Sequence, residues 1–224
     1  MGQLSASTAH EVKQPIASMI INAQAALRFL ELQPPSVEQA RPVLAQIIED
    51  GVRVGDIVDG IRALFKKTPS RKEHLDINAA IRGVLELTRG EVVKSGVLVQ
   101  TDLAQGLPLI ECDRVQFQQV TLNLILNAIE AMSGVDEGTR ELLISTREAE
   151  PNGVLVGVRD SGPGVAPAIL ERVFEAFYTT KSSGLGMGLS ICRSIVEAHG
   201  GRLWATGHTP QGAFFHFTIP ARPA

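Results

Sequence analysis

The sequence predicts an α+β protein in two parts, an N-terminal antiparallel helical hairpin and a second part in which helices pack on one β-sheet. The hairpin is indicated by apolar residues that recur at alternating intervals of four and three along residues 4–31 and 40–65, with a Gln33-Pro34-Pro35 turn between the two stretches. The sheet is indicated by the mixture of helix-like and strand-like patterns that begins near residue 75. We therefore expect two domains.

Both hairpin helices carry coiled-coil seams. The first seam contains Val12, Ile16, Met19, Ala23, Ala26 and Leu30. The second helix begins after Ser36, which forms a capping box with Gln39, and its seam contains Ala40, Leu44, Ile47, Gly51, Val54, Val58, Ile61 and Phe65. Further apolar residues flank the seams at Ile20, Leu27, Ile48, Ile57 and Leu64. Because a lone hairpin gives each stripe only one neighbour, we expect two copies to associate as a homodimeric four-helix bundle.

A polar and charged stretch, interrupted by Pro69, separates the two parts. We assign residues 1–68 to the hairpin domain, 69–74 to a linker and 75–224 to the second domain. The patterns of the second domain predict helices over 78–93, 113–132 and 189–199, and strands over 97–102, 141–147, 154–159, 202–206 and 213–219.

Composition and charge exclude several classes of function. A net charge of −3 and a pI near 6.0 leave no basic stripe, so we expect no nucleic-acid partner. Cys112 and Cys192 lie far apart and outside any metal-binding spacing, so we interpret both as reduced core residues. No apolar run is long enough to span a bilayer, and we expect a cytoplasmic chain. The helical pattern is already running at Leu4, which indicates a longer parent protein; whether that parent is membrane-associated stays open.

Two glycine-rich stretches indicate an ATP pocket. In the first, Asp160 can accept a hydrogen bond from the adenine amino group, while Gly162 and Gly164 let the backbone approach the base. The second opens into a helix N-terminus, whose N–H groups and dipole favour phosphate oxygens. Its residues are Gly184, Leu185, Gly186, Met187, Gly188 and Leu189. The chain has no Gly-x-x-x-x-Gly-Lys-[Ser/Thr] pattern, which disfavours a P-loop site.

A magnesium ligand is expected on the helix that precedes the glycine loops. Asn123 and Asn127 lie one turn apart on one face, and the amide oxygen of Asn127 suits a Mg²⁺ ion that bridges phosphates, with Glu130 holding a metal-bound water. A helix asparagine alone more often bonds to a neighbour, but the two loops downstream favour the ligand role. Lys181 either pairs with a phosphate or is a solvated loop residue, and Tyr178 either covers the adenine or packs.

The segment His-Glu-Val-Lys-Gln-Pro, residues 10–15, offers a nucleophile. If the seam faces inward, the His10 imidazole points into solvent, where a neutral ring nitrogen can attack a γ-phosphoryl group. Glu11 can accept the proton of the other ring nitrogen, and Pro15 weakens the helix at this point. The remaining histidines have no comparable setting, and we assign no role to His74, His199, His208 or His216.

These elements, in this order, resemble the sensor histidine kinases of two-component signalling. Residues 10–15 look like the H-box, 123–132 like the N-box, 160–164 like the G1 box, 174–181 like the F-box and 184–189 like the G2 box. The resemblance covers nearly the whole chain and is nearest to kinases linked to PAS-type sensors, including the rhizobial oxygen sensors. It implies an α/β-sandwich ATP-binding domain of the kind shared with gyrase and heat-shock chaperone ATPases.

The resemblance also implies an activity: autophosphorylation of His10 from Mg-ATP, then transfer to an aspartate of a response-regulator receiver domain. No sensor domain is present in this chain. Where family members that also act as phosphatases carry Thr or Asn, this chain has Gln14, whose amide remains able to orient a water. Ala213 stands where related sites often have Thr, which removes one adenine-side contact.

Two other classes of function are compatible with the ATP pocket. One is an ATP-driven clamp or chaperone in which Glu130 activates water, and the other is a non-enzymatic dimer that binds ATP as a regulator. The exposed histidine expected on the upstream hairpin favours the kinase.

Overall fold

The computed structural model of the chain describes residues 2–65, 72–134, 138–150, 152–179, 186–207 and 211–221. Within these ranges, side chains are described except at residues 2–14, 49, 52–53 and 55–65. The chain divides into two compact units, Met1–Lys66 and Lys67–Ala224, and each is described by itself.

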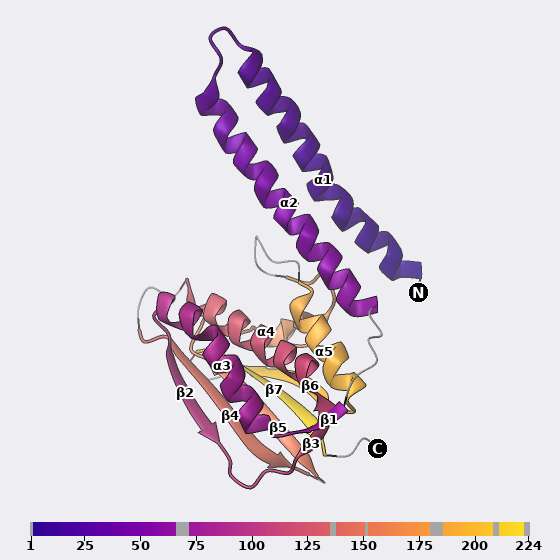
Figure 1. Ribbon diagram of the computed structural model, residues 1–224, viewed down its shortest axis with the longest axis vertical. Helices are drawn as coiled ribbons and strands as arrows, with labels where there is room; N and C mark the ends of the chain where they lie inside the picture. The colour runs from indigo at the N-terminus through magenta and orange to yellow at the C-terminus, as the bar shows by residue number, and fades with distance from the viewer. Residues whose placement is uncertain are drawn as a thin grey trace. The chain divides into compact units, whose positions relative to one another are not determined.

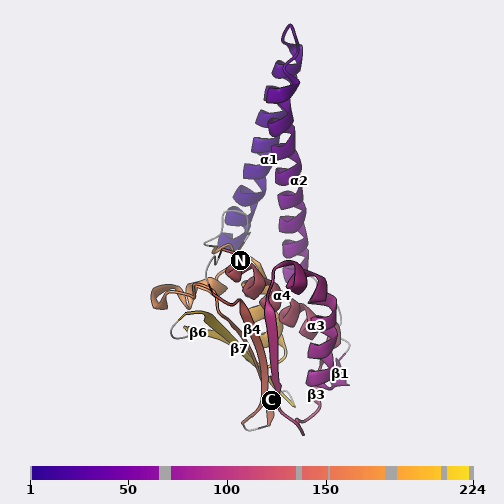
Figure 2. The ribbon, with the colours of Figure 1, turned by 90° about the vertical axis from the view of Figure 1, so that its left-hand side faces the viewer.

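The first unit is a hairpin of two long helices, α1 (Gly2–Glu31) and α2 (Val37–Phe65), which lie side by side in Figures 1 and 2. The turn is closed by the Ser36 N–H, which donates to the Phe29 carbonyl oxygen at 2.8 Å. The second helix begins directly after Ser36, where the capping pattern predicts its start.

Among the seam residues whose side chains are described, some are buried inside the hairpin and others are exposed. Ala26 and Ala40 are buried, and Met19 is half-buried. Ile16 and Leu30 stay 40% and 42% exposed. In a single hairpin each helix has one helical neighbour, so one side of each described seam is left without a packing partner.

The second unit is built on a five-stranded sheet covered by helices on one side (Figures 1 and 2). In spatial order its strands are β2 (Leu98–Leu103), β4 (Glu141–Ala149), β5 (Gly153–Asp160), β7 (Ala213–Pro220) and β6 (Arg202–Gly207). The β2–β4 pair is parallel and the other pairs are antiparallel. The covering helices are α3 (Ile77–Lys94), α4 (Arg114–Met132) and α5 (Gly188–Ala198). Two short 3-10 turns, Pro167–Ile169 and Arg172–Phe174, lie between β5 and α5.

Aspartates fix the starts of two of these helices. The Asp76 carboxylate accepts from the Ala79 N–H at 3.0 Å, and the Asp113 carboxylate accepts from the Gln116 N–H at 3.1 Å. Alternate residues of β4 and β5 then point into one core, which they share with Phe117 and Leu124 of α4.

Two short strands were not predicted from the sequence patterns. Strand β1 (Lys72–Leu75) pairs antiparallel with β3 (Ile110–Asp113), so residues 72–74, assigned to the linker from composition, are part of a ladder. Only Leu75 of β1 is buried, and a four-residue strand with three exposed polar side chains shows no alternation that a pattern can detect. In the part of the chain that is described, no helix combines the length and apolar character needed to cross a membrane.

Candidate functional site

The first glycine loop begins at Asp160, the last residue of β5, which is buried. Its Oδ1 atom accepts from the Gly162 N–H at 2.8 Å and from the Ala213 N–H at 3.3 Å. Because both donors belong to the backbone, the carboxylate is held in one orientation. A fixed, buried acceptor is the property that recognition of an adenine amino group requires.

This loop touches the turn before β7 backbone to backbone. Gly164 and Gly212 have φ values of 82° and 114°, which disfavour residues with a Cβ. A Cβ on Gly212 would lie 2.1 Å from the Asp160 carbonyl oxygen, and one on Gly162 would lie 2.9 Å from the Asp160 Oδ1 atom. The sequence pattern predicted roles for Gly162 and Gly164 but not for Gly212, which a Gln-Gly pair directly before a strand could have indicated.

The second loop leads into α5, which begins at Gly188 directly after the buried Met187. Met187, the N-cap residue, makes no side-chain capping hydrogen bond, and N–H groups at such a helix start are able to bind an anion. Leu189 packs partly on the core. Lys181, Gly184 and Leu185, which the sequence analysis also assigned to nucleotide binding, lie outside the described residues.

The second loop is held against residues 177–178. The Phe177 N–H donates to the Gly186 carbonyl oxygen at 3.1 Å, and both residues have positive φ, 69° and 64°. A Cβ on Gly186 would lie 2.4 Å from the Tyr178 carbonyl oxygen, so only glycine fits. The Tyr178 ring is half-buried with the Arg172 guanidinium 4.6 Å from its centroid, an arrangement compatible with either predicted role of this tyrosine.

Helix α4 lies against both loops. Asn127 faces the start of α5, since a Cβ on Gly188 would lie 4.0 Å from the Asn127 Nδ2 atom. Asn123, one turn earlier, donates from Nδ2 to the Cys192 Sγ atom of α5 at 3.7 Å. The Glu130 side chain is exposed, and the carbonyl oxygen of the next residue, Ala131, lies against Gly162 of the first loop. The predicted adenine and phosphate ends of the site thus meet successive turns near the C-terminal end of one helix.

The donor set fits a magnesium ion that is held mainly by phosphate and water. The described residues contain no group of three or more His, Cys, Asp or Glu side chains able to hold a metal. A single amide oxygen, that of Asn127, beside a helix N-terminus is what remains, and Mg²⁺ bound to phosphates needs only one or two protein ligands.

The predicted nucleophile lies on the other unit. His10, Glu11 and Gln14 are part of helix α1, and their side chains lie outside the described ones. Pro15, inside the same helix, is buried.

Comparisons with known proteins match both units. Residues 1–70 match the His Kinase A (phospho-acceptor) domain, and residues 112–223 match the family "Histidine kinase-, DNA gyrase B-, and HSP90-like ATPase". The sensor histidine kinase TmoS of Ectopseudomonas mendocina is 37% identical over 98% of this chain and 23% of its own length. The sensor protein FixL of Bradyrhizobium diazoefficiens is 35% identical over 99% of this chain and 44% of its own length. The chain thus spans less than half of each of these two relatives.

Solved structures agree with this match. The histidine kinase ThkA, in complex with the response regulator TrrA, is similar with a TM-score of 0.72 and 28% identity, over 99% of this chain and 62% of that one. Full-length ShkA in complex with AMPPNP is similar with a TM-score of 0.68 and 26% identity, over 100% of this chain and 46% of that one.

Proposed function

Because the chain belongs to the sensor histidine kinases of two-component systems, with the ATPase domain and the phospho-acceptor domain that define them, we propose that it carries out their phosphotransfer. In this proposal it binds Mg-ATP, phosphorylates His10, and passes the phosphoryl group to an aspartate of a response-regulator receiver domain. Because the reaction draws on ATP, we assign it to the cytoplasm.

The observation that carries the proposal is the arrangement along α4. A buried carboxylate, Asp160, held by two backbone N–H groups, lies toward one end, and the uncapped start of α5 faces Asn127 one turn away. Asp160 then accepts from the adenine amino group, and the α5 N–H groups bind phosphate oxygens. Asn127 holds Mg²⁺, which when bound neutralises phosphate charge.

The chemical step belongs to His10. A ring nitrogen of the neutral imidazole attacks the γ-phosphorus, the N–P bond forms, the bond between this phosphorus and the bridging oxygen breaks, and ADP leaves. Glu11 accepts a hydrogen bond from the other ring nitrogen, which orients the ring, and its negative charge stabilises the positive charge that develops on the imidazole. In the second transfer, an aspartate carboxylate oxygen of the receiver domain attacks the same phosphorus, the O–P bond forms, the N–P bond breaks, and His10 leaves as a neutral imidazole.

The exposed apolar stripe of the hairpin supports a homodimer as the working form. It contains Ile16, Ile20, Leu27 and Leu30 of α1 and Val37, Leu44 and Ile48 of α2, all at least 40% exposed in one chain. Their helical spacing makes one continuous face, and a second copy presents the same face.

Incubation with γ-labelled ATP tests the proposal. The kinase acquires an acid-labile label that His10→Ala abolishes, and Asn127→Asp, which alters the metal ligand, loses the label while remaining a dimer. Free phosphate without labelled protein would instead indicate a clamp-type ATPase, and nucleotide binding with neither product would indicate a regulatory ATP site. Labelled protein that transfers its label to no receiver domain in a panel would contradict the second step.

A further inference from the structure

Helices α4 and α5 are joined by polar side chains along their length. They run antiparallel, because the last part of α4 meets the start of α5 at Asn127 and Gly188, while Asp113, at the start of α4, meets the end of α5 at His199. Between these ends lies the Asn123–Cys192 contact. Nothing in the phosphotransfer step uses Cys192 or His199, so their polar contacts need an explanation.

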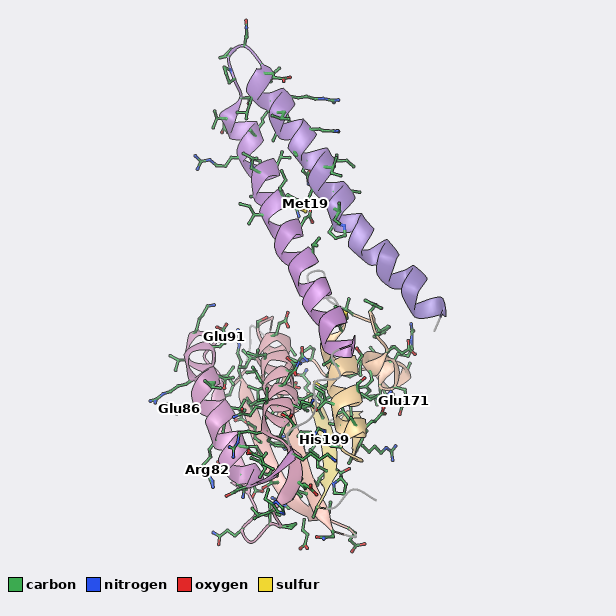
Figure 3. The ribbon with its side chains drawn as sticks, turned by 45° about the vertical axis from the view of Figure 1, so that its right-hand side comes forward. Met19, Arg82, Glu86, Glu91, Glu171 and His199 are labelled. Atoms are coloured by element: carbon green, nitrogen blue, oxygen red, sulfur yellow. The ribbon has the colours of Figure 1, made fainter. Side chains whose placement is uncertain are left out.

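His199 is buried, with 5% of its surface exposed, and uses both ring nitrogens (Figure 3 labels it). Its Nε2 atom lies 3.2 Å from the Asp113 backbone nitrogen, and its Nδ1 atom lies 2.8 Å from the Ile195 carbonyl oxygen. Because a backbone N–H can only donate, Nε2 is the acceptor, and Nδ1 carries the ring proton. The imidazole therefore joins the C-terminal end of α5 to the N-cap residue of α4.

Cys192 is fully buried in the middle of α5. Its Sγ atom accepts from the Asn123 amide at 3.7 Å and lies 3.9 Å from the Val120 carbonyl oxygen. Burial raises the pKa of the thiol to about 12, so the thiol stays protonated and donates a hydrogen bond to the Val120 carbonyl oxygen. The thiol thus bridges two groups of α4 one turn apart, which an apolar residue of the same size cannot do.

We propose that His199 and Cys192 are positioning residues, which fix α5 along α4 so that the N–H groups at Gly188 face the Asn127 side chain. The proposal rests on the proposed function of this site as the phosphate and magnesium end of an ATP pocket. A slip of α5 by one residue displaces its N-terminus by about 1.5 Å, and a misplacement of about 1 Å can cost about 100-fold in rate.

The test measures the affinity of the whole 224-residue chain for a non-hydrolysable ATP analogue with an imido bridge, with Mg²⁺ and with a chelator. The ratio of the two affinities is the magnesium increment. We expect Cys192→Ala to lower this increment about tenfold, the lower end for loss of a group that orients a metal ligand, and Cys192→Ser, which keeps donor and acceptor, to restore it. His199→Phe and His199→Gln form a second pair of the same design.

Ser194→Ala, on the exposed side of α5, is the matched control and keeps the increment of the unaltered chain. If the two residues had only a structural role, their variants would lose equal affinity for the analogue with and without Mg²⁺, or Cys192→Ser and His199→Gln would not restore the magnesium increment. Either result overturns the proposal. If Cys192→Ala does not fold, Cys192→Val fills the volume without the hydrogen bonds and is judged by the same outcomes. Failure of the unaltered chain to bind nucleotide contradicts the proposed function instead.

Discussion

The two units of this chain differ in how far each completes its own core. In the second unit, large side chains such as Phe117, Leu124, Ile144 and Phe217 are buried almost completely in one cluster. In the hairpin, the buried apolar side chains among those described are small ones, namely Pro15, Ala26 and Ala40. The sheet unit therefore has the apolar burial to fold as one chain, whereas the described part of the hairpin keeps large apolar side chains such as Ile20 and Ile48 exposed.

A buried carboxylate marks the same difference. Among described side chains, Oδ2 of Asp50 in α2 is the one buried polar atom without a hydrogen-bond partner. The buried polar side chains of the sheet unit, such as Thr146 and Asp160, are hydrogen-bonded within it. An unsatisfied buried oxygen is costly, and among the described side chains the hairpin carries this cost and the sheet unit does not.

The largest expected effect comes from a charge in the exposed stripe. Ile48 is 69% exposed in one chain, and Ile48→Glu removes its burial from both copies of the proposed dimer, about 3–6 kcal/mol in total. We expect the dimer dissociation constant to rise at least about 100-fold, measured by analytical ultracentrifugation over a dilution series. Leu87→Glu on α3, where the side chain is 75% exposed, is the matched control and leaves the dimer intact. An unchanged dimer in Ile48→Glu would show that another surface holds the copies together.

Truncating a core side chain of the sheet unit should lower its stability by the same amount at every protein concentration. Phe217 is fully buried and packs on Phe117 with ring centroids 5.8 Å apart. Phe217→Ala should lower the free energy of unfolding by about 3–5 kcal/mol. The single tryptophan, Trp204, lies on the neighbouring strand and reports this transition by fluorescence in a urea titration. A loss that changes with protein concentration would mean that the unit does not fold independently of the dimer.

A glycine-to-alanine substitution should have opposite effects on stability in the two units. Gly51 lies inside α2, where among the described residues a new Cβ meets Met19 at the ordinary contact distance of 3.6 Å, so Gly51→Ala should stabilise the hairpin by about 0.5–1 kcal/mol. At Gly186, positive φ and the close Tyr178 carbonyl make Gly186→Ala cost at least about 1–2 kcal/mol locally. We expect calorimetry to show weaker nucleotide binding for Gly186→Ala, about tenfold or more, and none of this loss for Gly51→Ala. If Gly186→Ala bound nucleotide as tightly as the unaltered chain, the second loop would not be part of the nucleotide site.

Sequence patterns predicted what repeats locally and missed what joins distant segments. The long helices, the strands of the main sheet and the shared helix face of Asn123 and Asn127 follow from periods of 3.6 and 2 residues. Strands β1 and β3 were missed because four residues carry too little periodicity. The contacts of Cys192 and His199 join residues 69 and 86 positions apart, and no local pattern encodes such a pairing.

The smallest expected effect is a pH dependence confined to the sheet unit. His216 stacks on Trp204 with ring centroids 5.2 Å apart, and burial lowers the pKa of its imidazole below the ordinary value of about 6.5. The unfolded chain then takes up this proton more readily than the folded one. Stability from this group is therefore complete above pH of about 6.5 and falls as the pH drops from there toward the lowered pKa.

His216→Phe keeps a ring beside Trp204 and removes the titration. Urea unfolding followed by Trp204 fluorescence between pH of about 5 and 8 should give two stability curves that diverge only below about 6.5, since all other titrating groups contribute to both. The dimer dissociation constant should show no difference between the two proteins at any of these pH values, because His216 lies in the unit that completes its own core. Parallel curves would mean that the imidazole titrates alike in the folded and unfolded chain, and a divergence in the dimer constant would mean that the two units are energetically coupled.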